Sequence, residues 1–216
     1  MSSEAPSPRR TDILRASPRM FESDILDKLS RVHPSVPVII FVPAIVALAL
    51  FGLERNGVPG FLGLLLGGYI VWTLTEYWLH RIVFHFEPDA KWGRRLHWII
   101  HGVHHDHPND PMRLVMPPSV SVPLALLFYG LFAFTLGPDA APALGAGFFA
   151  GYLFYDMTHY HVHHHKPKTW AGRKLRELHM RHHFQDHTKS YGVSAPWWDT
   201  IFGTAAKRRR KERAAG

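Results

Sequence analysis

The stretch that decides the fold is residues 36–79, VPVIIFVPAIVALALFGLERNGVPGFLGLLLGGYIVWTLTEYWL. It contains two apolar runs, at about 36–53 and 60–79, separated by the turn-forming sequence ERNGVPG. Each run has roughly the 17–20 residues with which an α-helix crosses a bilayer. Because the connection is short and rich in Gly and Pro, the two runs are predicted to form a helical hairpin.

A second pair of apolar runs follows at about 119–136 and 142–158, joined by GPDAAP. The mean hydropathy of the chain is only -0.10 although 46% of its residues are hydrophobic, so apolar blocks alternate with strongly polar ones. The sequence therefore predicts an all-α integral membrane protein with four transmembrane helices, arranged as two hairpins.

The basic residues give the orientation of these spans. The two hairpin tips carry only Arg55, whereas the N-terminal arm and the segments 80–115 and 159–216 hold nearly all the other Lys and Arg residues. By the positive-inside rule, both termini and these polar segments are expected on the cytoplasmic side. The predicted domains are an N-terminal cytoplasmic or interfacial arm (1–35), a membrane domain (36–204) and a basic tail (205–216).

The formal net charge of +8 is better explained by a membrane surface than by nucleic acid, because the charge is concentrated around the apolar runs. Cysteine is absent, which excludes disulfides and thiolate ligands. A metal site in this chain must use nitrogen and oxygen ligands.

All of the 17 histidines except His33 fall between positions 80 and 187. They cluster in HRIVFH (80–85), HGVHH (101–105), THYHVHHH (158–165) and HMRHH (179–183), all in segments expected at the cytoplasmic end of the spans. The spacing H-x-x-H-H places its imidazoles within about 100° of arc on a helix. These segments are expected to form a helical, histidine-rich cytoplasmic cap.

The spacing leaves the register of the third cluster open, because both the pair His159 and His163 and the triplet His161, His164 and His165 fit one helix face. A single histidine on a polar face is usually solvated, but recurrent spacings of the commonest metal ligand favour a metal site. Roughly ten facing histidines, at four to five per ion, indicate two metal ions.

These clusters, together with HPNDPMRLVMPP (107–118) and YGVSAPWWDTIFGT (191–204), resemble the membrane fatty acid hydroxylase superfamily and, within it, the fatty acid (sphingolipid) 2-hydroxylases. The likeness extends from about His80 to Thr204. It implies a set of metal ligands: His80, His85, His101, His104, His105, His159, His163, His179, His182 and His183. The resemblance gives no ligand role to His97, His107, His161, His164, His165 and His187, of which His97 is expected to orient a ligand.

The resemblance also implies the chemistry, which is hydroxylation of C2 of a fatty acyl chain by O2 and two external reducing equivalents. Two iron ions are the expected cofactor, and zinc is able to replace them in a purified sample. Relatives often carry a cytochrome b5 domain with an H-P-G-G signature, whereas here His33-Pro34 is followed by Ser35-Val36. A separate electron donor, cytochrome b5-like or a ferredoxin, is therefore expected.

The substrate is expected to be a membrane lipid or fatty acyl compound whose polar head lies at the membrane boundary. Tyr155 and Asp156 are candidates for positioning it, and Tyr152 and Arg113 for binding it. An interfacial aromatic belt explains the tyrosines equally well, and a positive-inside anchor explains the arginine. Residues Trp197–Asp199 are expected to pack the cap over the metals.

Two other functional interpretations remain open. A carotenoid or sterol hydroxylase, or a desaturase, shares the histidine clusters. A histidine-rich metal transporter is a different class of protein, and it is disfavoured because such loops are usually irregular, whereas these histidines recur at helical spacing.

Overall fold

The computed structural model describes residues 7–207, and within that range the chain forms helices and no strands. Residues 208–216, most of the predicted basic tail, lie outside the described residues. The elements are α1 (Arg10–Arg15), α2 (Asp24–Leu29), α3 (Ser35–Trp78), the π-helix η1 (Leu79–Phe84), α4 (Lys91–His97), the π-helix η2 (Trp98–Gly102), α5 (Val103–Asp106), α6 (Pro118–Leu136), α7 (Ala141–His164), α8 (Trp170–Phe184) and α9 (Trp197–Ile201).

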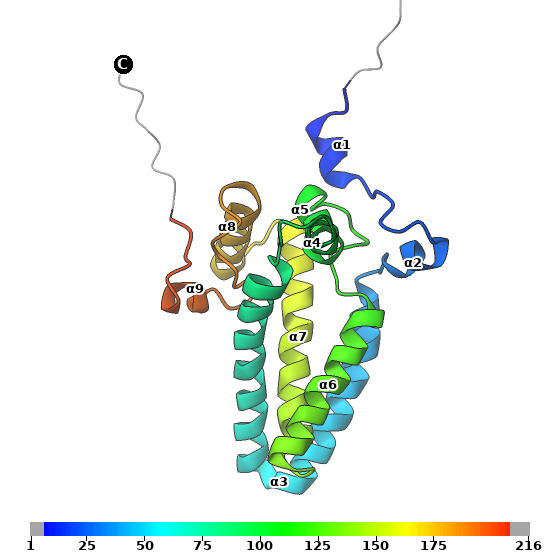
Figure 1. Cartoon of the computed structure of the whole chain (residues 1–216). Coiled ribbons are helices and arrows are strands. Elements are labelled where there is room, and N and C mark those ends of the chain that lie inside the picture. Colours follow the sequence, from blue (N-terminus) through cyan, green and yellow to red (C-terminus); the bar gives the residue numbers. More distant parts are fainter. Residues whose placement is uncertain (1–6, 208–216) are drawn as a thin grey trace, which may run out of the picture.

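The first predicted hairpin lies within α3. Gly57 has φ 62° and ψ 175°, a conformation that interrupts the helix and that glycine adopts without a steric penalty. Figure 1 shows α3 as two arms that meet at the foot of the bundle, the first on the right and the second on the left, with α7 between them in this view. The two runs are therefore antiparallel helices, as the turn sequence predicted.

The second hairpin consists of α6 and α7, which are joined by a short turn at Gly137, where φ is 83°. At this end of the bundle the two tips are connected, since Arg55 Nη1 donates to Asp139 Oδ1 (2.5 Å) and Asn56 Nδ2 donates to the Asp139 carbonyl (2.7 Å). Helix α7 continues without interruption to His164, beyond the apolar run that ends at about residue 158. The histidines after that run thus stand on a rigid extension of the same helix.

Glycines allow α3 and α7 to approach each other closely. A Cβ atom at Gly68 would lie 1.9 Å from the Leu144 carbonyl oxygen, and one at Gly147 would lie 1.9 Å from the Leu65 carbonyl oxygen. Small residues at such a crossing let helices in a membrane gain packing contacts between backbones. Because α3 and α7 both continue into histidine-bearing segments, this crossing fixes how those segments face each other.

Two helical stretches of the described chain are long and apolar enough to cross a membrane, Ser35–Phe84 and Pro118–Leu136. The first contains both runs of the predicted hairpin, because it folds back at Gly57. Outward-facing side chains on α3 and α6 are apolar and exposed, for example Leu50 (64%), Leu126 (67%) and Phe134 (89%). In water such a surface would be unfavourable, so lipid is the environment that suits it.

The shorter helices gather at one end of the bundle and form a cap (Figure 1). In this view α8 and α9 lie on one side of α4 and α5, and α1 and α2 lie on the other. The N-terminal arm is hydrogen-bonded to the loop between α5 and α6: Val32 N donates to the Met112 carbonyl (2.7 Å), and Asn109 N donates to the Leu14 carbonyl (2.9 Å). Two buried residues of the arm, Met20 and Val32, join it to the cap.

Candidate metal centre

The cap brings the ten predicted ligand histidines together in two groups of five, in each of which one nitrogen per residue lies within 4.8 Å of all the others. The first group is His80, His85, His101, His105 and His182. The second group is His104, His159, His163, His179 and His183. Four of the five second-group histidines come from α7 and α8, whereas the first group draws on η1, η2, α5, α8 and the residue after η1.

The two H-x-x-H-H motifs divide in the same way between the groups. In HGVHH, the outer pair His101 and His105 joins the first group and the inner His104 joins the second. In HMRHH the outer pair, residues 179 and 183, joins the second group and His182 joins the first. Residues four apart lie about 40° apart around a helix, whereas the residue three along lies about 60° to the other side. Each motif therefore lies between the groups and supplies both.

Two first-group ligands lie in π-helical segments, which no local sequence pattern predicts. His80 is in η1 and His101 is in η2. A π-helical turn accommodates an additional residue and is common at functional sites. His80 lies beside His101, with their Nε2 atoms 3.1 Å apart, and the rings of His85 and His101 are 5.0 Å apart.

Backbone carbonyls hold two first-group imidazoles. His80 donates its Nδ1 proton to the Tyr191 carbonyl (2.6 Å), and His182 donates its Nδ1 proton to the Lys189 carbonyl (2.7 Å). A carbonyl only accepts, so each neutral ring carries its proton on Nδ1 and a lone pair on Nε2. Such partners fix the tautomer and the orientation of metal-ligating histidines.

The surroundings keep these imidazoles neutral. Burial, reinforced by neighbouring imidazoles, lowers the pKa of His105 to about 2 and that of His85 to about 3. Burial also lowers the pKa of His182 to about 4, and it lowers the pKa values of His104 and His179 well below their ordinary value. At neutral pH the groups therefore present uncharged nitrogen donors, which is the form of histidine that binds a metal.

The donor geometry fits a metal ion in each group. The Nε2 atoms of His163 and His179 are 2.8 Å apart, and the Nε2 atoms of His183 and His179 are 3.1 Å apart. Nitrogen donors arranged around an ion at about 2.0–2.1 Å have separations of this order. Lone pairs converging in a buried space repel one another unless a cation lies between them. An all-imidazole donor set suits iron, zinc, copper or nickel and not magnesium or calcium.

The other histidines of the cap lie outside both groups within the described chain. His97 Nδ1 lies 3.8 Å from Glu87 Oε2, and its ring is 6.2 Å from that of His85. Its expected role in orienting a ligand stays a prediction. His161 and His165 are exposed and stacked on each other, with ring centroids 4.9 Å apart. The alternative triplet of the third cluster, His161, His164 and His165, thus lies outside both groups.

A cavity of about 320 Å³ lies beside both groups. His101 of the first group lines it, together with His104 and His159 of the second. Its other walls are mostly apolar, and they come from the N-terminal arm, η2, α5, the loop before α6 and the beginning of α6. Tyr155 and Asp156 also line this cavity. An apolar cavity with a few convergent polar groups is the usual form of a small-molecule site.

The predicted substrate residues on α7 are buried. Asp156 accepts a hydrogen bond from Tyr152 Oη (3.1 Å) and from Met116 N (3.3 Å), and 1% of its surface is exposed. This carboxylate is bonded to the loop before α6 and not to a histidine of either group. Tyr155 stacks on the His159 ring, with centroids 5.8 Å apart.

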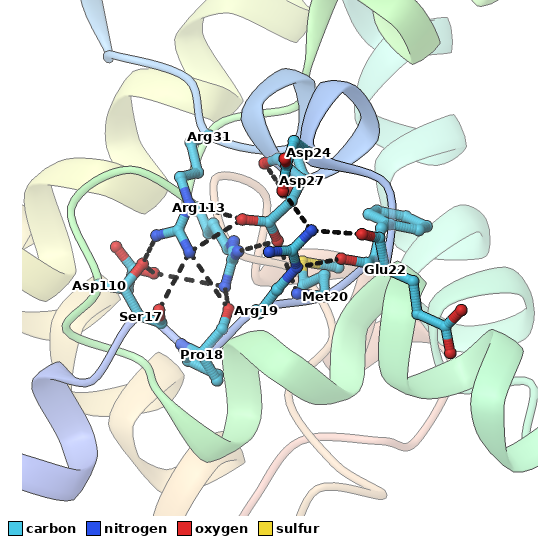
Figure 2. A network of polar contacts seen from close by, with 12 residues as sticks. Ser17, Pro18, Arg19, Met20, Glu22, Asp24, Asp27, Arg31, Asp110 and Arg113 are labelled. Carbon is cyan, nitrogen blue, oxygen red and sulfur yellow. Dashed lines mark hydrogen bonds and ion pairs between the residues drawn. The ribbon is translucent and has the colours of Figure 1, made fainter.

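Arg113 lies in a network that holds the N-terminal arm (Figure 2). Its Nη2 donates to Asp27 Oδ1 (3.1 Å), its Nη1 donates to the Pro18 carbonyl, and 3% of its side chain is exposed. Ser17 Oγ donates to Asp110 Oδ2 (2.6 Å), which ties the arm to the loop that follows α5. Arg113 also contributes to the cavity lining, so its expected role in binding the substrate stays a prediction.

Glu76 is a buried polar residue that the sequence reasoning did not select. Its carboxylate, with 2% of the residue exposed, accepts from Ser194 N (2.8 Å) and from the Ser194 hydroxyl. An ionisable residue inside a predicted span is the signal that could have identified it. Together with the hydrogen bond from Trp198 Nε1 to Thr73 Oγ1 (3.1 Å), it fastens the segment 191–204 to α3.

Comparison with known proteins identifies a family whose model covers the histidine clusters and the segment 191–204. The model of the family described as "Fatty acid hydroxylase" matches residues 65–204. The chain is 37% identical over 202 residues to the dihydroceramide fatty acyl 2-hydroxylase FAH1 of Arabidopsis thaliana, covering 92% of this chain and 85% of that protein. It is 41% identical over 140 residues to the ceramide very long chain fatty acid hydroxylase SCS7 of Saccharomyces cerevisiae, covering 63% of this chain and 36% of that protein.

A solved structure is similar as well. The chain described as "Full length scs7p (only hydroxylase domain visible)" superposes with a TM-score of 0.81 at 35% sequence identity. The likeness covers 85% of this chain and 70% of that chain. The match therefore extends over most of the chain.

Proposed function

The chain belongs to the fatty acid hydroxylase family, and from this premise we propose that it is a membrane-bound dimetal hydroxylase that hydroxylates C2 of a fatty acyl chain. The family is the one predicted from the sequence. Beyond the family, we propose the roles of the site residues, the substrate cavity and the orientation in the membrane.

The observation that carries the proposal is the cavity that meets both histidine groups. Histidines of the first and second groups line one space of about 320 Å³ whose remaining walls are mostly apolar. A metal held only for structure or for storage needs no such neighbour. An acyl chain in this cavity would place a C–H bond beside both groups, with water excluded by the apolar walls.

The ten grouped histidines would hold the two ions, one ion in each group of five. Iron is the proposed working metal, because hydroxylation of an unactivated carbon needs a redox metal to activate O2. The net reaction takes up O2, two electrons and two protons, inserts one oxygen atom into the C2–H bond and releases the other as water. Zinc fits the same nitrogen donors, but it does not change oxidation state.

The chain's own residues prepare this site in three ways. The carbonyls of Lys189 and Tyr191 hold the Nδ1 protons of two imidazoles and leave Nε2 available. The carboxylate of Asp156, bonded to Tyr152, offers an acceptor in the cavity wall for the hydroxyl or amide group next to C2. The N-terminal arm, including α2, forms one wall of the cavity.

We further propose four membrane crossings, at about 36–53, 60–79, 119–136 and 142–158, with both termini and the metal centre on the cytoplasmic side. The kink at Gly57 and the exposed apolar surfaces of α3 and α6 support this count. So does the concentration of Lys and Arg at the cap end of the bundle. A lipid head at the boundary would then lie at the depth of the cavity.

The acyl chain is proposed to be linked to a sphingoid base. The relatives named above are described as acting on dihydroceramide or ceramide acyl chains. A free acid or a thioester is the alternative carrier. The electrons are proposed to come from a separate donor, cytochrome b5-like or a ferredoxin.

The proposal is tested by producing the chain in cells that lack 2-hydroxylated lipids and analysing their lipids by mass spectrometry. The expected product carries one additional oxygen at C2 of the acyl chain, and 18O2 supplies that atom. An oxygen on a carotenoid or sterol ring, or a new double bond, would contradict the proposal in favour of the related enzymes.

A matched pair of variants separates the hydroxylase from a metal transporter. His104→Ala removes a nitrogen that lines the cavity, whereas His165→Ala removes an exposed histidine outside both groups. The hydroxylase is expected to lose its product with the first variant and keep it with the second. Product retained in His104→Ala would overturn the assignment.

A further inference from the structure

A segment far along the chain, residues 189–206, contributes no histidine but holds two first-group imidazoles through its backbone. The carbonyls that accept from His182 and His80 belong to Lys189 and Tyr191, two residues apart. Any change in the path of these three residues would move both acceptors together.

Asp199 lies at the centre of this segment, and 2% of its surface is exposed. Its Oδ1 accepts from Tyr191 N (2.8 Å) and from Thr204 Oγ1 (2.7 Å), and its Oδ2 accepts from Gly192 N (2.8 Å). All three partners donate, so only a group with acceptors on both oxygens satisfies them. A carboxylate is such a group, whereas an amide would direct two N–H bonds toward at least one of these donors.

The backbone around Asp199 closes the same loop. Thr204 N donates to the Asp199 carbonyl (2.7 Å), and Ser190 N donates to the Thr204 carbonyl (2.9 Å). Ser190, which stands between the two acceptor residues, has φ 59°, a left-handed conformation that is costly for a residue other than glycine. Such a conformation persists only where the surroundings determine it, and here those surroundings are the hydrogen bonds that converge on Asp199 and Thr204.

We propose that Asp199 is a positioning residue for the metal of the first group. It fixes the path of residues 189–191, whose carbonyls set the tautomer and direction of His80 and His182. The second group differs, because the Nδ1 atoms of His179 and His183 are buried without a hydrogen-bond partner among the described residues. The effect of Asp199 is therefore specific to one of the two ions. This inference rests on the proposed function, since it assumes that each group holds a metal.

The test is a metal titration of the purified full chain with Fe²⁺ or Zn²⁺ against a competing chelator, with bound metal measured by mass spectrometry. The wild type is expected to hold two ions per chain. Asp199→Asn is expected to hold one ion as tightly as the wild type and the other about 10–100-fold more weakly, the range typical of losing an outer partner of a metal ligand. Asp110→Asn is the matched control, because Asp110 is equally buried at 2% but bonds to the arm and not to a ligand's partner.

A milder pair of variants keeps the test decisive if Asp199→Asn does not fold. Thr204→Val removes one donor to Asp199 at nearly constant shape, and Thr204→Ser restores the hydroxyl. The first is expected to weaken one ion by a smaller factor, and the second to bind as the wild type does. A wild type with two ions whose variants keep both, or lose both equally, would overturn the inference alone. A wild type that binds no metal would overturn the proposed function and the inference with it.

Discussion

The two histidine groups each gather five imidazoles from motifs of the same spacing, but different parts of the molecule hold them. The first group is assembled from short segments, two of them π-helical, and two of its rings, those of His80 and His182, are bonded to the carbonyls of Tyr191 and Lys189. The second group stands mainly on α7 and α8, two regular helices, and the Nδ1 atoms of its α8 histidines have no partner in the described chain. Rigid helices and a hydrogen-bonded loop are thus two different ways to orient a histidine ligand. The two groups should therefore respond to different substitutions.

Loss of a single ligand should have the largest effect and should act on one group at a time. His80→Ala is expected to release the first-group ion and His179→Ala the second-group ion, because each removes a buried nitrogen donor from one set of five. Product formation should fall in both by more than the roughly 100-fold upper range for outer partners. Metal content per chain and product yield are the measurements, and His161→Ala, at an exposed site, is the control. Release of both ions by either variant would mean that the groups do not act separately.

Substitutions at the helix crossing should affect both groups together. Gly68→Ala and Gly147→Ala each place a Cβ against a backbone carbonyl oxygen that cannot move aside. Overpacking of this kind costs about 1–3 kcal/mol. The expected result is a lower midpoint of thermal unfolding in detergent, with the two ions weakened alike. Gly63→Ala, where nothing lies within 4 Å, should leave the midpoint unchanged or slightly higher, and an equal loss at Gly63 would contradict the explanation.

Arg176 is expected to stabilise the second group. Its guanidinium donates to carbonyls at the end of α7, those of Val162, His163 (3.4 Å) and His165 (2.9 Å), and so joins the two helices that carry most of this group. Arg176→Met is expected to weaken the second-group ion by about 10-fold, the lower end for an outer partner, and to spare the first. Chelator titration measures this, and Arg173→Met, at an exposed neighbour, is the control. Together with Asp199→Asn it forms a pair with opposite expected selectivity.

Detaching the N-terminal arm should have the smallest effect on the metals. Arg113→Met leaves Asp27 and Asp110 without their buried partner, so the arm should separate from the cavity wall. Both ions should remain, while kcat/KM falls severalfold through a higher KM, since the arm lines the cavity but supplies no ligand. Arg9→Met, which breaks only an exposed ion pair, should change neither quantity. Metal loss in Arg113→Met would show that the arm supports the ligands themselves.

The sequence predicted the helical hairpins, because they depend on local periodicity. It also predicted which ten histidines would come together, because their motifs are recognisable. The division of H-x-x-H-H between two groups follows from helix geometry, since residues four apart lie about 40° apart and the residue three along lies about 60° to the other side. The sequence did not say which group each motif would join, because that depends on how α3 and α7 cross at Gly68 and Gly147.

Other features of the site had no local signal. Backbone acceptors such as the Tyr191 carbonyl leave no trace in residue identity, and the π-helical turns at His80 and His101 depend on tertiary packing. The cavity combines the arm with segments about a hundred residues away, so its walls could not be read from either part alone. The ion-pair partner of Arg113, Asp27, lies 86 positions earlier in the chain, so no local pattern around Arg113 predicts this contact.

The separation of the two groups is tested most directly by locating the metals in the iron-loaded chain with anomalous diffraction at the iron absorption edge. Two peaks are predicted, one within about 2.0–2.2 Å of the Nε2 atoms of the first group and one at the same distance from those of the second. A single peak, or a peak outside these two sets of nitrogens, would contradict the account of a two-metal hydroxylase built from two groups of five histidines.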